Sequence, residues 1–414
     1  MPSFFKSDRP ARSRAQRLER PLNKTNYLTN QNLNNIGEIM IKILHFITDT
    51  NIGGAGNLLC NQINGLNEKQ FAIFVALPKG SLLIQRLKSL PCRIIECKYG
   101  ADKSLSIESI NENYQIIKKV NPDIVHSHGS LSSRIAATIS KIPCRIFTRH
   151  CAPALSKIAQ NSLMKFSFKV VNDVLSTAII APSEFAKQNL IEMGASPQKI
   201  ATIINGASPL RTLDDNEKDF LRARYGLEKE NFVISYFARL EEIKGHKTLL
   251  EAAKICKKWH PNFRFLIVGS GHLEKNLKEY AQHLDVCDVV HFVGFQNDVA
   301  PIFNITDINL NCSYGSETAP LSLSEGMSLG IPPITSNIGG NPYMIKNGEN
   351  GLLFPAHNPE LLADAIIRLY SDKKLYTQCS LGALVRYQTE LNDKIMWQKM
   401  NDFYLMEYRK AKTL

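Results

Sequence analysis

The feature that most limits how this chain can fold is a rhythm that begins at Met40 and occurs twice. Short apolar runs alternate with amphipathic stretches long enough to form helices, as in Ile41–Thr48 followed by Asn57–Gly65. Strands that alternate with helices of about ten or more residues predict a parallel sheet covered by helices on both faces. The strands predicted in the first half are Ile41–Thr48, Phe71–Pro78, Cys92–Lys98, Asp123–Gly129, Cys144–His150, Thr177–Ser183 and Lys199–Gly206. Those predicted in the second half are Phe232–Leu240, Phe263–Gly271, Val289–Phe295, Asp307–Ser313 and Ile331–Asn337.

A polar, charged connector, Ser208–Asn231, separates the two halves. Two doubly wound domains that face each other bring the carboxyl ends of their strands around one cleft, where open α/β sheets bind ligands. We therefore predict an α/β chain with an N-terminal domain over 40–207, a linker over 208–230 and a C-terminal domain over 231–390. The segment 391–414 has helical periodicity and is expected to be a helix that packs back on the N-terminal domain.

Composition limits the class of protein. The 414 residues are 44% hydrophobic and 21% charged, as in ordinary globular proteins, and suffice for two or three domains. No apolar run is long enough to span a membrane, no apolar block follows the basic N-terminus as in a signal peptide, and the nine cysteines form no C-x-x-C pair. We expect a protein of the reducing cytoplasm without a zinc site or disulfides.

The formal net charge of +12 would suit an anionic partner such as nucleic acid, a membrane surface or a phosphorylated substrate. Residues 1–39 are basic, polar and without apolar periodicity, so we expect a disordered extension. Met40 directly precedes the first strand, which favours a dispensable segment or a misassigned start over a nucleic-acid-binding tail. No nucleic-acid partner is therefore expected.

The loop Asp49–Gly56 (DTNIGGAG) lies between the first predicted strand and a helix. Glycines allow a backbone to approach a ligand closely, and a helix N-terminus favours an anion. Gly53 and Gly54 are therefore candidate ligand-binding positions. A tight structural turn explains them equally well, because the loop does not match G-x-G-x-x-G.

Histidines follow two neighbouring strands of the first half. His128 ends one predicted strand, where an imidazole can donate to a substrate oxygen or move a proton. His126 points to the same side of the strand, so only one of the two need face a ligand, and a hydrogen-bonded core histidine is an equal explanation for His126. Arg149 and His150 occupy the same place after the next strand.

Two cations follow the first strand of the second half. Arg239 and Lys244 lie near Gly245, which lets the chain turn. Together they could neutralise a diphosphate, arginine through its planar fork and lysine as a point charge. Taken alone, a solvated basic loop is the better explanation, because Glu241 and Glu242 lie nearby.

Two acids flank a proline in the apolar stretch Cys312–Gly340. Pro320 fits the first turn of a helix and Gly330 its end, so Glu317 would lie in the preceding loop and Glu325 inside the helix. The helix N-terminus could hold a phosphate while each carboxylate accepts from the hydroxyls of a sugar or ribose. A surface loop acid and a helix-surface acid are the alternatives.

Taken together, these motifs resemble those of retaining glycosyltransferases of family 4 (glycosyl transferases group 1), which share the two-domain GT-B fold. The resemblance runs from Met40 over nearly the whole chain and is most specific over Phe232–Pro355. It rests on the glycine loop, the histidine, the Arg–Lys pair, the two glutamates with seven residues between them, and the loop Asn347–Pro355.

The resemblance implies a role for each matched residue. His128, Arg239, Lys244 and Glu317 would be catalytic, with His128 facing the reacting sugar and Glu317 contacting its hydroxyls. The donor would be bound by Gly53, Gly54, Arg239, Lys244, Phe295, Leu321, Ser322 and Glu325. Within that set, Arg239 and Lys244 would hold the diphosphate and Glu325 the ribose, Phe295 would border the base, and Leu321 and Ser322 would offer N–H groups.

The chain departs from the family pattern at four positions. Gly56 stands where an acid is frequent, and Pro320 stands where many relatives have glycine. Gly326 replaces the usual alanine after the second glutamate, and Tyr343 replaces a common glutamate. None of these removes an expected donor ligand.

The reaction implied by the resemblance is transfer of a sugar from a nucleoside-diphosphate sugar to an acceptor hydroxyl with retention of anomeric configuration. Cations and a helix N-terminus would stabilise the departing diphosphate, so we expect neither a metal nor a cofactor. The acceptor would be a glycan or a lipid-linked glycan of lipopolysaccharide or capsule synthesis. The alternatives are a nucleotide-sugar epimerase or hydrolase of the same fold, a non-catalytic nucleotide-sugar-binding module, and an NAD-dependent dehydrogenase, which would need a dinucleotide fingerprint that is absent.

A lysine-bearing apolar segment, Ser156–Leu175, is the candidate for contact with a membrane. As an interfacial helix it could bring the enzyme to anionic lipid at the inner face of the plasma membrane. An ordinary domain helix is an equal alternative.

Overall fold

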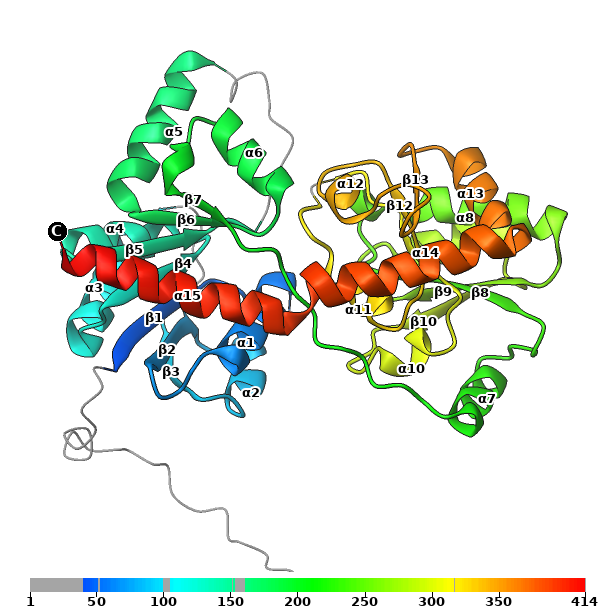
Figure 1. Cartoon of the computed structure of the whole chain (residues 1–414), viewed down its shortest axis with the longest axis horizontal. Coiled ribbons are helices and arrows are strands. Elements are labelled where there is room, and N and C mark those ends of the chain that lie inside the picture. Colours follow the sequence, from blue (N-terminus) through cyan, green and yellow to red (C-terminus); the bar gives the residue numbers. More distant parts are fainter. Residues whose placement is uncertain are drawn as a thin grey trace, which may run out of the picture. The chain divides into compact units, whose positions relative to one another are not determined.

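The computed structural model describes residues 40–50, 53–99, 105–150, 152, 161–315 and 317–413, and from Met40 onward the chain forms one compact unit. Residues 1–39 and Lys157 of the candidate membrane segment lie outside the described residues, as does the start of that segment. The described part contains two parallel sheets with flanking helices, which confirms the predicted doubly wound α/β architecture (Figure 1).

The first sheet has seven strands in the order β3-β2-β1-β4-β5-β6-β7, all paired in parallel. Its strands are β1 Ile41–Ile47, β2 Phe71–Pro78, β3 Cys92–Cys97, β4 Ile124–His128, β5 Cys144–Thr148, β6 Ala178–Ala181 and β7 Ile200–Thr202. Its helices are α1 Gly54–Gly65, α2 Leu83–Leu87, α3 Ile107–Val120, α4 Leu131–Ile139, α5 Ser162–Leu175, α6 Glu184–Glu192 and the short 3-10 turn η2 Pro197–Lys199.

Alternate residues of the first sheet are buried under different helices. On β1, Ile43 and Ile47 pack with α1 in one cluster, whereas Leu44 and Phe46 pack with α3 and α4 in another. Burial on both faces explains why the strand sequence is almost continuously apolar rather than alternating.

The second sheet has six parallel strands in the order β10-β9-β8-β11-β12-β13. Its strands are β8 Phe232–Phe237, β9 Phe263–Val268, β10 Val290–Gly294, β11 Ile308–Asn311, β12 Pro333–Ser336 and β13 Leu352–Phe354. The remaining elements are α7 Asp215–Arg224, η3 Glu242–Lys244, α8 His246–Trp259, α9 Glu274–His283, α10 Ala300–Phe303, α11 Leu321–Ser328, α12 Asn341–Met344, α13 Pro359–Ser371, α14 Lys373–Arg386, the π-helical turn η4 Tyr387–Leu391 and α15 Asp393–Lys412.

Helix α7 and strand β13 are among the observed elements that the sequence pattern did not predict. The connector contains helix α7, which begins with a capping box between Asp214 and Glu217 and buries none of its residues. The segment treated as a loop after the second glutamate contains β13, whose three residues pair with β12. Several observed strands are also shorter than predicted, because the polar residues at their carboxyl ends lie in the loops that carry the candidate site.

The C-terminal helix α15 packs on the first sheet. Met396, Met400, Phe403 and Tyr404 belong to the same buried cluster as β1 and α1. Ala207 pairs with Asn392 at the start of α15, and the Trp397 indole N–H donates to the Asn61 carbonyl of α1 at 2.8 Å. The last helix therefore completes the core of the first domain.

Candidate functional site

Each sheet contains a topological switch point, and the candidate residues other than Phe295 lie there. In the second sheet, β8 lies between β9 and β11, so the strand order reverses between β8 and β11. In the first sheet the reversal lies between β1 and β4. Ligands of open α/β folds bind outside the carboxyl ends of the strands at such points, because the two following loops diverge there.

A close backbone approach holds the loop after β8 against the end of β11. Gly245 has φ +66°, and a Cβ atom at this position would lie 2.2 Å from the Cys312 carbonyl oxygen. Only glycine fits both the left-handed conformation and this contact. Lys244, directly before it, is thereby fixed beside the loop after β11.

Lys244 and Glu317 form an ion pair with little solvent exposure. The Lys244 ammonium donates to Glu317 Oε1, and the Ser313 hydroxyl donates to the same oxygen at 2.6 Å. The Tyr236 hydroxyl donates to the Lys244 carbonyl at 2.7 Å. The two side chains are 18% and 9% exposed, so solvent screens their attraction weakly. The predictions of separate roles for Lys244 and Glu317 did not include this pairing.

Arg239 is held differently from Lys244. Its side chain is 70% exposed and forms an ion pair with Glu241 at 2.6 Å. An exposed pair of this kind is weak and is easily exchanged for another anion. Of the two predicted diphosphate-binding cations, Lys244 is therefore fixed in a hydrogen-bonded network and Arg239 lies at the surface.

Helix α11 begins immediately after this network. Pro320 precedes it in extended conformation (φ −61°, ψ 119°), at the N-cap rather than in the first turn. The N–H groups of Leu321 and Ser322 open the helix, where no intrahelical acceptor is available to them. This end of the helix can therefore accept an anion.

Glu325 lies one turn into α11, and its carboxylate makes no hydrogen bond or ion pair with the described residues. Its side chain retains some solvent exposure but is largely surrounded by protein, and this desolvation raises the pKa of Glu325 to about 7. The Glu325 carboxylate therefore lacks hydrogen-bond donors, which the hydroxyls of a ligand could provide.

The glycine after Glu325 has a local structural cause. A Cβ atom at Gly326 would lie 2.6 Å from Asn309 Nδ2 and 3.0 Å from Phe303. Asn309 in turn donates to the Ser322 carbonyl at 2.8 Å. The departure from the usual alanine is therefore explained by the buried asparagine beneath α11.

The glycine loop of the first sheet opens helix α1. A Cβ atom at Gly54 would meet nothing within 4 Å, and Gly53, the N-cap residue, has φ −108°. Neither backbone conformation nor packing in this structure requires glycine at position 54, so the space beside it suits a ligand. Gly56, by contrast, faces Leu83, from which a Cβ atom would be 3.0 Å away.

Asp49 is a further candidate residue, which the sequence pattern did not indicate. Burial raises the pKa of the Asp49 carboxyl, while the backbone N–H of Gly56 and the charge of Arg239 lower it. An acid near the start of α1 is thus present in the glycine loop, although it precedes the glycines. Its position before rather than after them is why the sequence pattern missed it.

The histidines of the first sheet form a buried cluster. His45 on β1 and His126 and His128 on β4 are at most 4% exposed. His45 Nδ1 is 3.0 Å from His128 Nε2, and His128 Nδ1 is 3.0 Å from His150 Nε2. His126 instead pairs with the Tyr404 hydroxyl at 2.6 Å and with Thr148 Oγ1 at 2.7 Å. To donate to a ligand, His128 would have to give up one of its two contacts.

Three of these histidines are close enough to share one metal ion. Ring nitrogens of His45, His126 and His128 lie within 4.8 Å of one another. However, the rings of His126 and His128 are stacked, with centres 4.2 Å apart and planes inclined by 29°, so their in-plane lone pairs run side by side rather than converging. Both nitrogens of each also have partners already. A hydrogen-bonded cluster fits these contacts better than a metal centre.

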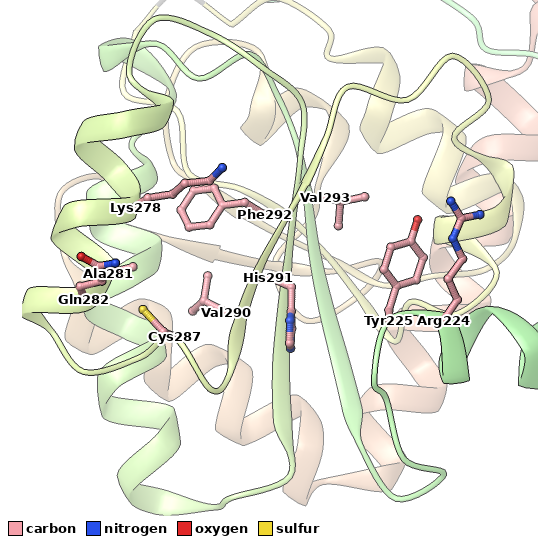
Figure 2. Close-up of a pocket in the computed structure, with 10 residues that line it drawn as sticks. All are labelled: Arg224, Tyr225, Lys278, Ala281, Gln282, Cys287, Val290, His291, Phe292 and Val293. Carbon is pink, nitrogen blue, oxygen red and sulfur yellow. The ribbon is translucent and has the colours of Figure 1, made fainter.

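Phe295 and a separate pocket lie at the edge of the second sheet. Phe295 follows edge strand β10 and is 57% exposed. A pocket of about 510 Å³ is lined by the end of α7, by α9 and by β10 (Figure 2). None of the predicted site residues lines it, so we place no part of the candidate site there.

Comparisons with known proteins extend over both domains. The glycosyltransferase family 4 model matches residues 52–209, and the glycosyl transferases group 1 model matches residues 217–383. An Escherichia coli UDP-Gal:α-D-GlcNAc-diphosphoundecaprenol α-1,3-galactosyltransferase is 31% identical over 284 residues, 65% of this chain and 72% of that protein. The Staphylococcus aureus capsular polysaccharide glycosyltransferase CapM is 24% identical over 377 residues, 88% and 96% of the two chains.

Solved structures agree with the fold. A Rickettsia africae glycosyltransferase superposes with a TM-score of 0.77 at 22% identity, covering 90% of this chain and 99% of that one. Anabaena HepE in complex with UDP and glucose gives a TM-score of 0.75 at 18% identity, covering 88% and 100%.

Proposed function

Because the chain belongs to the glycosyl transferases group 1 family, family 4, we propose that it moves a sugar from a nucleoside-diphosphate sugar to a hydroxyl of a lipid-linked or polysaccharide acceptor. A UDP-sugar is the first donor to test, since the E. coli relative is named for UDP-Gal and HepE was crystallised with UDP. The relatives named for diphosphoundecaprenol and capsule favour an acceptor of cell-surface glycan synthesis.

The observation that carries this proposal is the Lys244–Glu317 ion pair at the β8–β11 switch point, directly before α11. Lys244 supplies a fixed positive charge, and Arg239 can leave Glu241 to supply a second. The first N–H groups of α11 add partial positive charge. This set suits a diphosphate, while the unpartnered carboxylate of Glu325 suits the two ribose hydroxyls.

We propose that the reaction retains the anomeric configuration. The bond between the anomeric carbon and the phosphate oxygen breaks, and its electron pair stays on the diphosphate. The acceptor oxygen bonds to the anomeric carbon on the same face, and its proton passes to the departing phosphate oxygen. Lys244 and the α11 N-terminus stabilise the charge that develops, so the scheme needs no metal or cofactor.

We also propose that α5 places the enzyme on an anionic membrane. Six of its apolar side chains, at positions 163, 164, 166, 170, 171 and 174, are between 41% and 71% exposed, and Asn172 is its one buried residue among those described. Leu163, Phe166, Val170 and Val174 recur at intervals of three and four and so share one face. Lys165 and Lys169 lie on the same helix, and a lipid-linked acceptor would itself be in the membrane.

We do not propose that this protein spans a membrane. None of the helices in the described part of the chain is both long and apolar enough to cross a bilayer. We propose the cytoplasmic face of the plasma membrane, where nucleotide sugars are available.

The donor and the reaction are tested with a panel of UDP-, GDP- and ADP-sugars and a lipid-diphosphate-linked sugar acceptor. We expect nucleotide release that depends on the acceptor, a product with the donor's anomeric configuration by NMR, and activity that survives EDTA. Release without acceptor would indicate a hydrolase or epimerase, and binding without turnover a non-catalytic module. Lys244→Ala and Glu317→Ala should each abolish transfer, and full activity in both would refute the site.

Membrane contact is tested by sedimentation with vesicles of phosphatidylglycerol and phosphatidylcholine. We expect Phe166→Asp to release the protein into the supernatant. Phe220→Asp on α7 is the matched control, because Phe220 is 70% and Phe166 64% exposed. Equal loss of binding in both variants, or no loss in either, would contradict the role of α5.

A further inference from the structure

Three of the clustered histidines form a line rather than a group around one point. The ring centres of His45 and His128 are 5.3 Å apart with planes inclined by 21°, and those of His128 and His150 are 5.2 Å apart with planes inclined by 16°. Each pair is also joined by a nitrogen–nitrogen distance of 3.0 Å. The rings are therefore nearly parallel and linked through their nitrogens, the geometry of successive N–H···N hydrogen bonds.

The line runs across three neighbouring strands on the face covered by α1 and α15. His45 pairs in register with His126, and Ile47 with His128, while His150 lies two residues beyond the end of β5. His126 is beside the line but is not a member, because Tyr404 and Thr148 occupy its nitrogens.

All three imidazoles are expected to be neutral. Burial lowers the pKa of His45 to about 3 and that of His150 to about 4, and it lowers the pKa of His128 well below its ordinary value, with help from the neighbouring rings. A neutral imidazole has one N–H and one lone pair. A line of three such rings can then point its hydrogen bonds in only one of two directions.

The inner end of the line indicates which direction is favoured. His45 Nε2 is buried and has no hydrogen-bond partner among the described residues. If the line pointed inward, this atom would be a buried N–H without an acceptor, whereas if it points outward, the atom is only an unused lone pair. Buried N–H groups without acceptors are the rarer of the two in folded proteins.

The outer end of the line adjoins the ion-pair network. The carbonyl oxygen of His150 accepts a hydrogen bond of 3.2 Å from the Thr318 hydroxyl, and Thr318 follows Glu317. Phosphate oxygens of a sugar nucleotide that carry no proton can only accept hydrogen bonds, so a fixed neutral donor at this place is chemically suited to them.

We propose that His45 Nδ1–H donates to His128, that His128 Nδ1–H donates to His150, and that His150 presents its Nδ1–H to an oxygen of the bound sugar nucleotide. His150 is then the residue that touches substrate, and His45 and His128 are positioning residues that fix its tautomer. The identity of the ligand rests on the proposed function, but the direction of the hydrogen bonds does not.

The direction of the hydrogen bonds is determined without ligand from long-range ¹H–¹⁵N spectra of deuterated, ¹⁵N-histidine-labelled protein between pH 8 and 5. We expect His45, His128 and His150 to be neutral Nδ1–H tautomers throughout, unlike the same residues in urea. Resonances are assigned by comparison with His45→Gln and His150→Asn. Neutral Nε2–H tautomers, or cations at pH 6, would overturn the proposal. So would stoichiometric binding of Co²⁺ with a tetrahedral absorption band.

The contact with ligand is tested by two substitutions at one position. Asparagine places its amide nitrogen where Nδ1 was, whereas glutamine reaches the position of Nε2. We expect His150→Asn to bind UDP-glucose or UDP-galactose nearly as wild type does, and His150→Gln to bind roughly tenfold more weakly, as for one lost neutral hydrogen bond. Equal affinity of the two variants would refute the contact. Failure of the wild type to bind either nucleotide would instead count against the proposed donor, with the spectra unchanged.

Discussion

Glu325 allows a direct test of the site, because its buried carboxylate should destabilise the free protein and yet contribute to donor binding. Its carboxylate has no partner among the described residues, and burial raises its pKa from the ordinary value of 4.5 to about 7. An acid with a raised pKa in the folded state favours folding at low pH, and that advantage is lost as pH rises from 4.5 through 7. The ionised side chain should therefore destabilise the free enzyme at alkaline pH.

The magnitude follows from the two pKa values. At 1.36 kcal/mol per pKa unit, the ionised carboxylate costs the folded state about 3 kcal/mol at pH 8 and about 1 kcal/mol at pH 5. Glu325→Gln removes the charge at nearly constant volume. We expect the variant to be more stable than wild type by up to about 3 kcal/mol at pH 8 and by much less at pH 5.

The assay is urea unfolding followed by tryptophan fluorescence. The chain has two tryptophans, so in a Trp397→Phe background Trp259 on α8 reports on the second domain alone. Glu279→Gln, at an exposed position of α9, is the control and should change stability little at either pH. Binding should move the opposite way, with the affinity of Glu325→Gln for nucleotide reduced roughly tenfold or more, as for a charged hydrogen bond. A stability gain of equal size at both pH values, or no gain, would refute the reasoning.

Three further predictions follow from the packing and the buried histidines. Gly245→Ala should destabilise the second domain and weaken donor binding more than Gly226→Ala does. Both positions have positive φ, but only at Gly245 would a Cβ atom meet a carbonyl oxygen. Urea midpoints and nucleotide titrations measure the two effects, and equal losses in the two variants would contradict this reasoning. Tyr404→Phe should lower the stability of the first domain by about 1–3 kcal/mol, because it leaves a buried His126 nitrogen without a partner. Thermal unfolding measures this loss, and an unchanged melting temperature would count against the hydrogen bond. In a Trp259→Phe background, where Trp397 reports on the first domain alone, that domain should lose about 1.4 kcal/mol per histidine for each pH unit below 6.5, since burial lowers the pKa of His45, His128 and His150. A flat profile from pH 6.5 to 5 would be inconsistent with neutral imidazoles.

The sequence predicted the architecture well, because buried parallel strands leave an unambiguous apolar pattern. Phe71–Pro78 is observed with the bounds predicted for it, whereas β13 was missed because three residues between glycines and a proline give too short a signal. Helix α7 was missed because it buries none of its residues and so has no apolar face to reveal it.

The candidate site was predicted as separate residues rather than as contacts. Lys244 and His128 were predicted from their places at the ends of apolar strands, and Glu317 from its place before the helix delimited by Pro320 and Gly330. Which of them pair could not be predicted, since the Lys244–Glu317 contact joins residues 73 positions apart in the chain. His45 was overlooked for a related reason, because it lies inside an apolar strand and its hydrogen-bond partner, His128, lies on another strand.

The return of α15 to the first sheet has a consequence for biosynthesis. Tyr404 reaches His126 from 278 residues away, and Met396, Met400 and Phe403 fill the same cluster as β1. During translation the first seven strands leave the ribosome long before this cover exists, so their apolar face stays open until residues 393–412 have been made. The second domain, whose main buried cluster lies between Ile234 and Cys379, can assemble earlier. Nascent chains arrested before residue 393 should therefore hold an unfinished first domain that chaperones recognise.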